Sequence, residues 1–363
     1  MLVPFIDLAY LFFISFISLF VLRKVANKVG LVDRPSGRKK HCGNIPLVGG
    51  ISICSTLAYF LFNNPKIIPN SEIYALCIIV LTIVGALDDR FDISFKTRFA
   101  IQSILSVVMM TAAKIELLTL GDILGTGEIT LGLLGYLVTI LAVVGAINAF
   151  NMVDGLDGLL GGISIVAFSG LGIMLLHDGQ SSLAYLCLVL VVIIVPYLFL
   201  NMGMFGLKRK IFMGDAGSML IGFTVIWFLL LSSQNGTTPP LRPVTALWLI
   251  AIPLMDMVAI MYRRVRRGCS PFRPDREHLH HIFQRLGFNS KQTVIIICLM
   301  SSLLAGFGIY GEIYGLSEAF MFYAFIIVFF IYATVLNYIW KITSYIRKKF
   351  FKNIDYSNLE AKQ

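Results

Sequence analysis

The stretch LAYLCLVLVVIIVPYLFLNM, residues 183–202, is long enough to cross a membrane and holds no charged side chain. A helix of about 20 mostly apolar residues spans the hydrocarbon core of a bilayer. The whole chain of 363 residues is 57% hydrophobic and 14% charged, against about 45–50% and about 25% in soluble domains. A soluble core of this size needs a polar surface. The composition therefore excludes a soluble fold, a disordered chain and a disulfide scaffold, and predicts a polytopic membrane protein.

Ten further apolar stretches accompany residues 183–202, and together they predict an all-α polytopic membrane protein with about 11 transmembrane helices. The predicted spans are 4–22, 45–62, 73–88, 99–113, 130–150, 158–177, 183–202, 211–231, 243–262, 292–312 and 318–341.

The positive charges predict the orientation of these spans. With the N-terminus outside and the C-terminus inside, 27 of the 30 Lys and Arg residues fall on the cytoplasmic side. Only Lys66, Lys114 and Arg242 fall outside. Cytoplasmic loops of membrane proteins carry such an excess of Lys and Arg, so the formal net charge of +10 is mainly a topology signal.

The first cluster of ionisable residues is Asp88-Asp89-Arg90-Phe91-Asp92, at the inner end of the third span. Ionisable residues at membrane depth are costly and are functional by default. Three acids so close together repel one another unless a cation binds, so the cluster predicts a Mg²⁺-phosphate site. A solvated helix end is the alternative. Lys96 and Arg98 follow within two turns and are candidates to hold phosphate oxygens, with ordinary positive-inside charge as the alternative.

The second cluster is NAFNMVDGLDG, residues 148–158, in the one predicted cytoplasmic loop without a basic residue. Asn148, Asn151, Asp154 and Asp157 recur at three-residue steps, and two glycines let the backbone approach a ligand. A simple turn would explain one Asp-Gly pair but not this recurrence. The loop is therefore predicted to bind substrate or metal.

Two further segments fit phosphate groups. FMGDAGS, residues 212–218, places Asp215 at the start of the eighth span, where backbone N–H groups suit a metal-bound phosphate; a helix-capping Asp is the alternative. The basic loop from Asp33 to His41 suits an anionic headgroup, with an ordinary positive-inside loop as the alternative.

The loop after the ninth span joins Arg264, within the run RRVRR at 263–267, to His278-Leu279-His280-His281. Histidines at i, i+2 and i+3 do not share one helical face, which argues against a three-His zinc site and favours contact with phosphate or sugar. After the turn-forming residues between Gly268 and Pro274, a short amphipathic helix is predicted, with Leu279, Ile282, Phe283 and Leu286 on one face. Asp256 is expected to orient this loop or to pair with an arginine.

Together these clusters combine carboxylates, which recruit Mg²⁺, with cations that bind diphosphates. One substrate is expected to be a membrane lipid phosphate and the other a cytosolic diphosphate. Nucleic acid is excluded as a partner, because the basic residues are spread among separate loops.

The motifs DDRFD, NAFNMVDGLDG, FMGDAGS and HLHH, in this order, resemble those of the polyprenyl-phosphate N-acetylhexosamine-1-phosphate transferase family. The resemblance extends from Asp33 to His281. Within the family, the interrupted run His278-Leu279-His280-His281 is similar to the N-acetylglucosamine branch, whereas the muramoyl-pentapeptide branch usually shows three consecutive histidines.

The resemblance implies that UDP-GlcNAc and undecaprenyl phosphate react to undecaprenyl-diphospho-GlcNAc and UMP. It places the chain in a bacterial inner membrane with the active site facing the cytoplasm, at the first membrane step of O-antigen or enterobacterial common antigen-type glycan synthesis. Residues 1–341 would form a single transmembrane catalytic domain and residues 342–363 a basic cytoplasmic tail. A homodimer is left open.

The resemblance also implies residue roles. The catalytic set is Asp88, Asp89, Asp154, Asp157 and Asp215. Asp215 is the expected Mg²⁺ ligand, helped by Asp154 or by Asp88 and Asp89, and Mn²⁺ can substitute at such an oxygen site. Asp157 and Asn151 would position the nucleotide, while the diphosphate and sugar would meet Arg264, His278, His280 and His281. The remaining candidates for substrate binding are Asp33, His41, Lys96, Arg98 and Asn148.

Alternatives of two kinds stay open. Within the same chemistry, the sugar could be another UDP-N-acetylhexosamine, such as GalNAc or MurNAc-pentapeptide. From another class, an ion-coupled secondary transporter also carries intramembrane carboxylates, but near the midplane and in related halves. Here the acids gather at one face and no internal repeat is visible. A prenyltransferase shares the DDxxD pattern but not the Asp154-Gly-Leu-Asp157 and histidine motifs.

Overall fold

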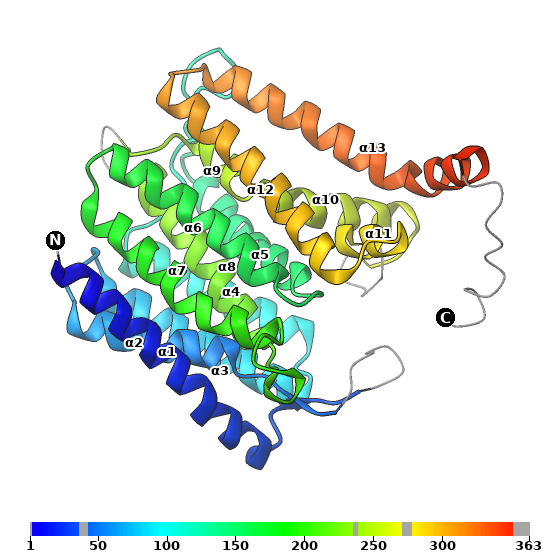
Figure 1. The fold of residues 1–363 in the computed structure, drawn as a ribbon. Helices are drawn as coiled ribbons and strands as arrows, with labels where there is room; N and C mark the ends of the chain where they lie inside the picture. The colour runs from blue at the N-terminus through cyan, green and yellow to red at the C-terminus, as the bar shows by residue number, and fades with distance from the viewer. Residues whose placement is uncertain (1, 36–42, 235–238, 271–277, 351–363) are drawn as a thin grey trace.

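The computed structural model describes residues 2–35, 43–234, 239–270 and 278–350, and these residues fold into a bundle of helices (Figure 1). Its α-helices are α1 (Leu2–Val29), α2 (Gly49–Asn63), α3 (Ser71–Phe91), α4 (Phe95–Ala112), α5 (Leu134–Val153), α6 (Leu159–His177), α7 (Ser181–Asn201), α8 (Gly214–Ser233), α9 (Pro243–Leu249), α10 (Ala251–Arg266), α11 (Leu279–Arg285), α12 (Ser290–Ile313) and α13 (Glu318–Phe350). Two short strands, β1 (Val32–Asp33) and β2 (Ile45–Pro46), pair antiparallel, and the turn η1 (Leu207–Arg209) precedes α8.

Each predicted span coincides with a helix or a helix pair, so the multi-helical membrane character is confirmed. Within the described residues, eight helices are long and apolar enough to cross a membrane, or nine if one bent pair is a single span. The count of 11 is not reached, because α2, with 15 residues, and α4 fall outside this set. The segment 45–48 also differs from prediction, since it forms β2 and a connection before α2 begins.

The predicted span 243–262 is not one continuous helix. The chain forms α9 and α10 instead, which meet at Ile250 with a bend of 83°. Pro253 gives the physical reason, because in one continuous helix its missing N–H would have bonded the carbonyl of Leu249. In the first turn of a new helix that N–H is not needed, so a break before Pro253 removes the conflict.

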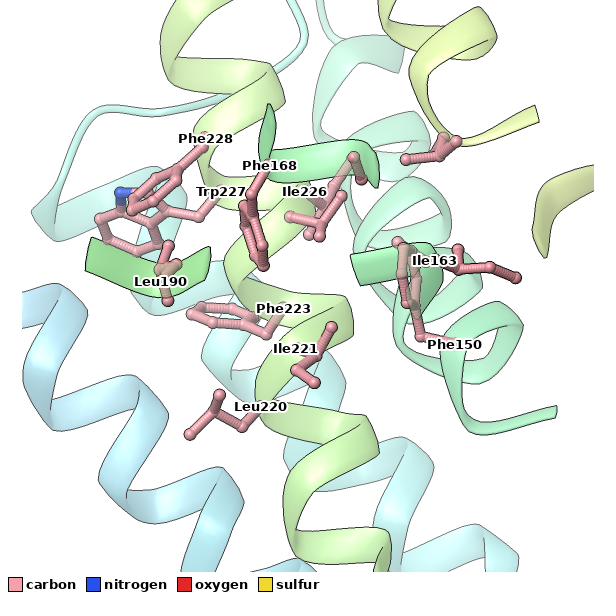
Figure 2. Packing of buried hydrophobic residues seen from close by; sticks show 14 of the residues in the cluster. Phe150, Ile163, Phe168, Leu190, Leu220, Ile221, Phe223, Ile226, Trp227 and Phe228 are labelled. Carbon is pink, nitrogen blue, oxygen red and sulfur yellow. The ribbon is translucent and has the colours of Figure 1, made fainter. Parts of the chain in front are cut away.

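Helix α8 is the centre of the bundle. Every residue of α8 except Asp215 is buried, and the helix packs against α2, α3 and α5. Figure 2 shows its large side chains Phe223, Trp227 and Phe228 among apolar residues of the neighbouring helices. A helix that is apolar on all sides belongs inside a bundle, which explains why α8 is enclosed.

Glycine permits the close contact between α8 and α5. A Cβ atom on Gly222 would lie 2.6 Å from the Cα of Ile147. We therefore expect Gly222→Ala to lower the thermal unfolding midpoint of the purified protein, at a cost of about 1–3 kcal/mol for overpacking. The matched control is Gly306→Ala on α12, where a Cβ meets nothing within 4 Å, so alanine's better helix propensity should raise stability slightly. Equal midpoints for the two variants would contradict this account of the packing.

The C-terminal helices pack against a different part of the bundle, with α12 against α6 and α9. Helices α12 and α13 diverge from the turn that joins them (Figure 1), and α13 contacts α9, α10 and α11. The predicted amphipathic helix is confirmed as α11, with Leu279 and Ile282 buried and Phe283 and Leu286 packed against the core. Helix α13 continues to Phe350, past the predicted end of the last span at 341.

Candidate functional site

The predicted acidic motifs lie at helix ends that meet at one end of the bundle. Asp88 and Asp89 occupy the last turn of α3, and Arg98 lies in the first turn of α4. Asp154 directly follows α5, and Asp215 lies in the first turn of α8. Hydrogen bonds and ion pairs connect α3, α4, α5 and α8 at these ends. Motifs more than 120 residues apart, such as Asp89 and Asp215, thus form one acidic cluster.

Arg98 lies between two carboxylates of this cluster. Its Nη1 forms an ion pair with Asp88 Oδ2 and lies 3.5 Å from Asp215 Oδ2. The Asp88 side chain is only 3% exposed, and a buried carboxylate is costly unless a cation or hydrogen-bond donor compensates it. Arg98 therefore offsets carboxylate charge in this structure. Its predicted contact with phosphate oxygens stays a prediction.

Asp89 caps the N-terminus of α8 from another helix. Its Oδ1 accepts a hydrogen bond from the N–H of Asp215 at 2.8 Å, and its Oδ2 accepts one from the N–H of Ala216 at 3.3 Å. Gly214, the first residue of α8, has φ 74°, and a Cβ there would collide with the Asp89 carboxylate. Free amides and the positive end of the helix dipole stabilise such a carboxylate. The alternative in which Asp215 serves as the cap is wrong, so its side chain is available for other contacts.

Asn151 orients the side chain of Asp215. Its Nδ2 donates to Asp215 Oδ1 at 2.5 Å and to Ser218 Oγ at 2.8 Å. Ser218 is fully buried, so the side-chain amide of Asn151 is held by both Asp215 and Ser218. Through this hydrogen bond, Asn151 determines the direction in which the Asp215 carboxylate points.

Asp154 lies close to three other acids. Burial raises its pKa well above the ordinary value of 3.8, and the charges of Asp215, Asp89 and Asp157 raise it further. A group in this position favours either a proton or a bound cation. The cluster is therefore suited to hold positive charge.

Asp157 and the following glycine are tied to the segment that precedes α8. Asp157 Oδ2 pairs with Lys210 Nζ at 2.5 Å. The buried Asn201, at the end of α7, accepts a hydrogen bond from the N–H of Gly158 at 2.6 Å and donates one to the carbonyl of Ile211 at 2.9 Å. Asn201 and Lys210 therefore hold the loop 154–158 beside the segment 207–213.

A buried carboxylate also organises the histidine cluster. Asp256 of α10 accepts a hydrogen bond from Nδ1 of His278 at 2.9 Å and one from the N–H of Leu279 at 3.2 Å. The expectation that Asp256 orients this loop is confirmed. Arg264, at the end of the same helix, is buried.

His280 connects the histidine cluster to the acidic one. Its ring is 3% exposed, and its Nε2 has no hydrogen-bond partner within the described residues. A Cβ on Gly155 would lie 2.5 Å from this nitrogen, so the ring rests against the backbone next to Asp154. Burial, together with the neighbouring His281 and His278, lowers the pKa of His280 to about 3. His280 is therefore a neutral imidazole at physiological pH.

The acidic cluster fits a hard divalent cation that arrives with a phosphate substrate. Among the described residues, no group of three or more His, Cys, Asp or Glu side chains forms a metal cage by itself. Mg²⁺ does not require one, because it keeps several waters and binds through one or two carboxylates plus substrate phosphates. Asp154 and Asp215 match this mode, whereas Asp89 is occupied by backbone amides and Asp88 by Arg98.

The other predicted site residues lie around this centre. Asn148, one turn before Asn151, donates to Gln102 at 3.3 Å and to the carbonyl of Val144 at 2.7 Å. Lys96 is exposed on the first turn of α4, and Asp33 lies in β1, which contacts α3. His41 lies outside the described residues.

Sequence reasoning did not identify Asn201 or Lys210 as site residues. The sequence does contain a feature that points to Asn201, since it is the one amide in the otherwise apolar stretch 183–202. No sequence feature points to Lys210, because it is one of three consecutive basic residues that the positive-inside rule already explains.

Comparison with known proteins gives consistent matches. The family described as "Glycosyl transferase family 4" matches residues 71–233. The undecaprenyl-phosphate alpha-N-acetylglucosaminyl 1-phosphate transferases of Salmonella typhi and of Escherichia coli (strain K12) are each 50% identical over 343 residues, covering 94% of this chain and 93% of the relative. The protein of the same name from Haemophilus influenzae is 51% identical over 337 residues, covering 92% of this chain and 94% of the relative.

Proposed function

We propose a function from the family to which this chain belongs, the undecaprenyl-phosphate alpha-N-acetylglucosaminyl 1-phosphate transferases within glycosyl transferase family 4. In the proposed reaction, the protein transfers N-acetylglucosamine 1-phosphate from UDP-GlcNAc to undecaprenyl phosphate. The products are undecaprenyl-diphospho-GlcNAc and UMP. One observation carries the proposal: the acidic cluster and the histidine cluster meet at one end of the bundle, where His280 rests against Gly155.

The reaction needs charge neutralisation around two phosphate-bearing substrates. Asp154 and Asp215 would hold Mg²⁺, or Mn²⁺ in its place. Such an ion, when bound, neutralises the charge that develops on the diphosphate. Asn151 keeps Asp215 aimed through its 2.5 Å hydrogen bond. Arg98 offsets the charge of the neighbouring carboxylates.

The histidine cluster is suited to receive the diphosphate and sugar of UDP-GlcNAc. With Nδ1 of His278 bound to Asp256, its Nε2 is the nitrogen available to a ligand. The neutral His280 has an unpartnered buried Nε2 that can accept or donate one hydrogen bond. Buried Arg264 supplies positive charge. Asp157, with Lys210, is the candidate for the nucleotide end.

Direct attack of the lipid phosphate on the β-phosphorus of UDP-GlcNAc is the favoured route. The second pKa of a phosphate monoester is about 6, so undecaprenyl phosphate is mostly dianionic at neutral pH and needs little help from a general base. The protein then contributes positioning and neutralisation. The alternative is a covalent aspartyl intermediate at Asp154 or Asp88.

The site is expected to face the cytoplasm of a bacterial inner membrane. Support comes from the charge distribution, which places 27 of 30 Lys and Arg on the side of the motifs. With this orientation, the site would take UDP-sugars from the cytoplasm. The lipid product would begin an O-antigen or enterobacterial common antigen-type glycan.

The transporter alternative fits the geometry less well. Ion pathways of transporters place carboxylates near the middle of the membrane. Here Asp88, Asp89, Asp154 and Asp215 all lie at helix ends. In the described part of the chain, the one sharply bent helix pair, α9–α10, breaks at the apolar Ile250 rather than at a polar group.

A substrate panel tests the proposal. Purified protein with undecaprenyl phosphate and Mg²⁺ is offered UDP-GlcNAc, UDP-GalNAc and UDP-MurNAc-pentapeptide in turn, and UMP release and lipid product are measured. We expect turnover with UDP-GlcNAc and, because attack is direct, no UMP without the lipid. Turnover only with another sugar would redirect the substrate assignment. A phosphosugar-protein adduct formed without lipid would replace direct attack by the covalent route, and absence of product with every sugar would overturn the proposal.

A further inference from the structure

Asp256 receives a third hydrogen bond from the last helix of the chain. The hydroxyl of Tyr332 on α13 donates to Asp256 Oδ1 at 2.7 Å. The same oxygen accepts the N–H of Leu279, and the other oxygen accepts Nδ1 of His278. Asp256 and Tyr332 are 3% and 9% exposed, so this set of bonds is shielded from water. One buried carboxylate therefore joins α10, α11 and α13.

Two observations distinguish this arrangement from ordinary packing. Helix α13 diverges from α12 and contacts the body of the protein through α9, α10 and α11 (Figure 1). The hydroxyl reaches a carboxylate that also bonds a histidine of the proposed site, rather than a structural backbone group.

We propose that Tyr332 is a positioning residue for the histidine cluster: through Asp256, its hydroxyl fixes the ring of His278 and the start of α11 against α13. The inference rests on the proposed function, because it assumes that His278 meets the diphosphate or sugar of UDP-GlcNAc.

The physical consequence follows from the geometry of Asp256. A carboxylate held by three donors cannot rotate without losing one of them, so Nδ1 of His278 is the bonded nitrogen and Nε2 points away from Asp256. Without the tyrosine hydroxyl, Oδ1 keeps only the long bond from Leu279, and the carboxylate gains freedom to turn. His278 would then sample orientations that do not match the substrate, and misplacement of about 1 Å can be costly to the rate.

The test uses Tyr332→Phe, which removes the hydroxyl and keeps the ring. We expect kcat/KM for UDP-GlcNAc to fall about 10- to 100-fold, by analogy with the loss that follows removal of a hydrogen-bonding partner of a metal-ligating histidine. The KM for undecaprenyl phosphate should stay unchanged. In a His278→Ala background, Tyr332→Phe should cause no further loss of activity, because both changes remove the same element of the site.

The matched control is Tyr74→Phe, which also removes a buried hydroxyl bond, the 2.9 Å contact of Tyr74 with Thr224 between α3 and α8. It should lower stability by a similar amount and leave kcat/KM intact. An active wild-type protein with equal kcat/KM in Tyr332→Phe and Tyr74→Phe would overturn the positioning role alone. So would a multiplicative loss in the double variant with His278→Ala. An inactive wild-type protein would overturn the proposed function and this inference together.

Discussion

Asp215→Asn is expected to leave the protein folded in the membrane but to slow UMP release by about 10³-fold or more, the scale of losing a principal charge-stabilising group. The Asp215 side chain is held by Asn151 at 2.5 Å and approached by Arg98 at 3.5 Å. An asparagine has the same shape but lacks the negative charge that a divalent cation requires. The measurement is kcat of the purified variant with UDP-GlcNAc and undecaprenyl phosphate over a range of Mg²⁺ concentrations.

The control for this experiment is Asp178→Asn, the same chemical change at an exposed residue that follows α6, at the opposite end of that helix from Gly158. Its activity and its Mg²⁺ dependence should equal those of the wild type. Full activity of Asp215→Asn would remove Asp215 from the metal site. Loss of activity with a collapsed thermal transition would show instead that Asp215 serves the fold.

Hydropathy alone predicted where the helices lie but not how they bend. Long apolar runs correspond to helices throughout the described residues, since burial in lipid leaves the backbone few other ways to satisfy its hydrogen bonds. The break at Ile250 depends on a local conflict around Pro253 that an average over about 20 residues conceals. The same averaging extended the second span into β2, because Ile45 and Pro46 are as apolar as the helix that follows.

For the candidate site, the sequence predicted which residues matter but not which of them contact one another. Clusters of acids and histidines in an apolar chain were visible in the sequence, because ionisable groups are rare there. Their contacts were not. Asp89 caps a helix that begins 125 residues later, at Gly214, and Tyr332 bonds a carboxylate 76 residues earlier. Such pairings depend on the packing of α3 against α8 and of α13 against α10, which no local pattern encodes.

Asp154→Asn is expected to lower kcat strongly and yet to stabilise the metal-free protein at neutral pH. Burial and three neighbouring carboxylates raise the pKa of Asp154 well above 3.8. The folded state therefore binds a proton more tightly than the unfolded state does, so wild-type stability falls as pH rises from about 4 toward the raised pKa. Asparagine carries no proton to lose and escapes this penalty. The loss in kcat should again be on the order of 10³-fold, because a cation-binding charge is gone.

Thermal unfolding between pH 4 and pH 8, with a chelator and then with Mg²⁺, separates these effects. In chelator, the midpoint of Asp154→Asn should exceed that of the wild type by a margin that grows with pH and vanishes near pH 4. Mg²⁺ should raise the midpoint of the wild type, since a ligand of the folded state stabilises it, and should raise that of the variant much less. A variant that is less stable than the wild type at every pH would mean that the Asp154 carboxylate forms a stabilising contact of its own. An equal response of both proteins to Mg²⁺ would place the cation elsewhere in the acidic cluster.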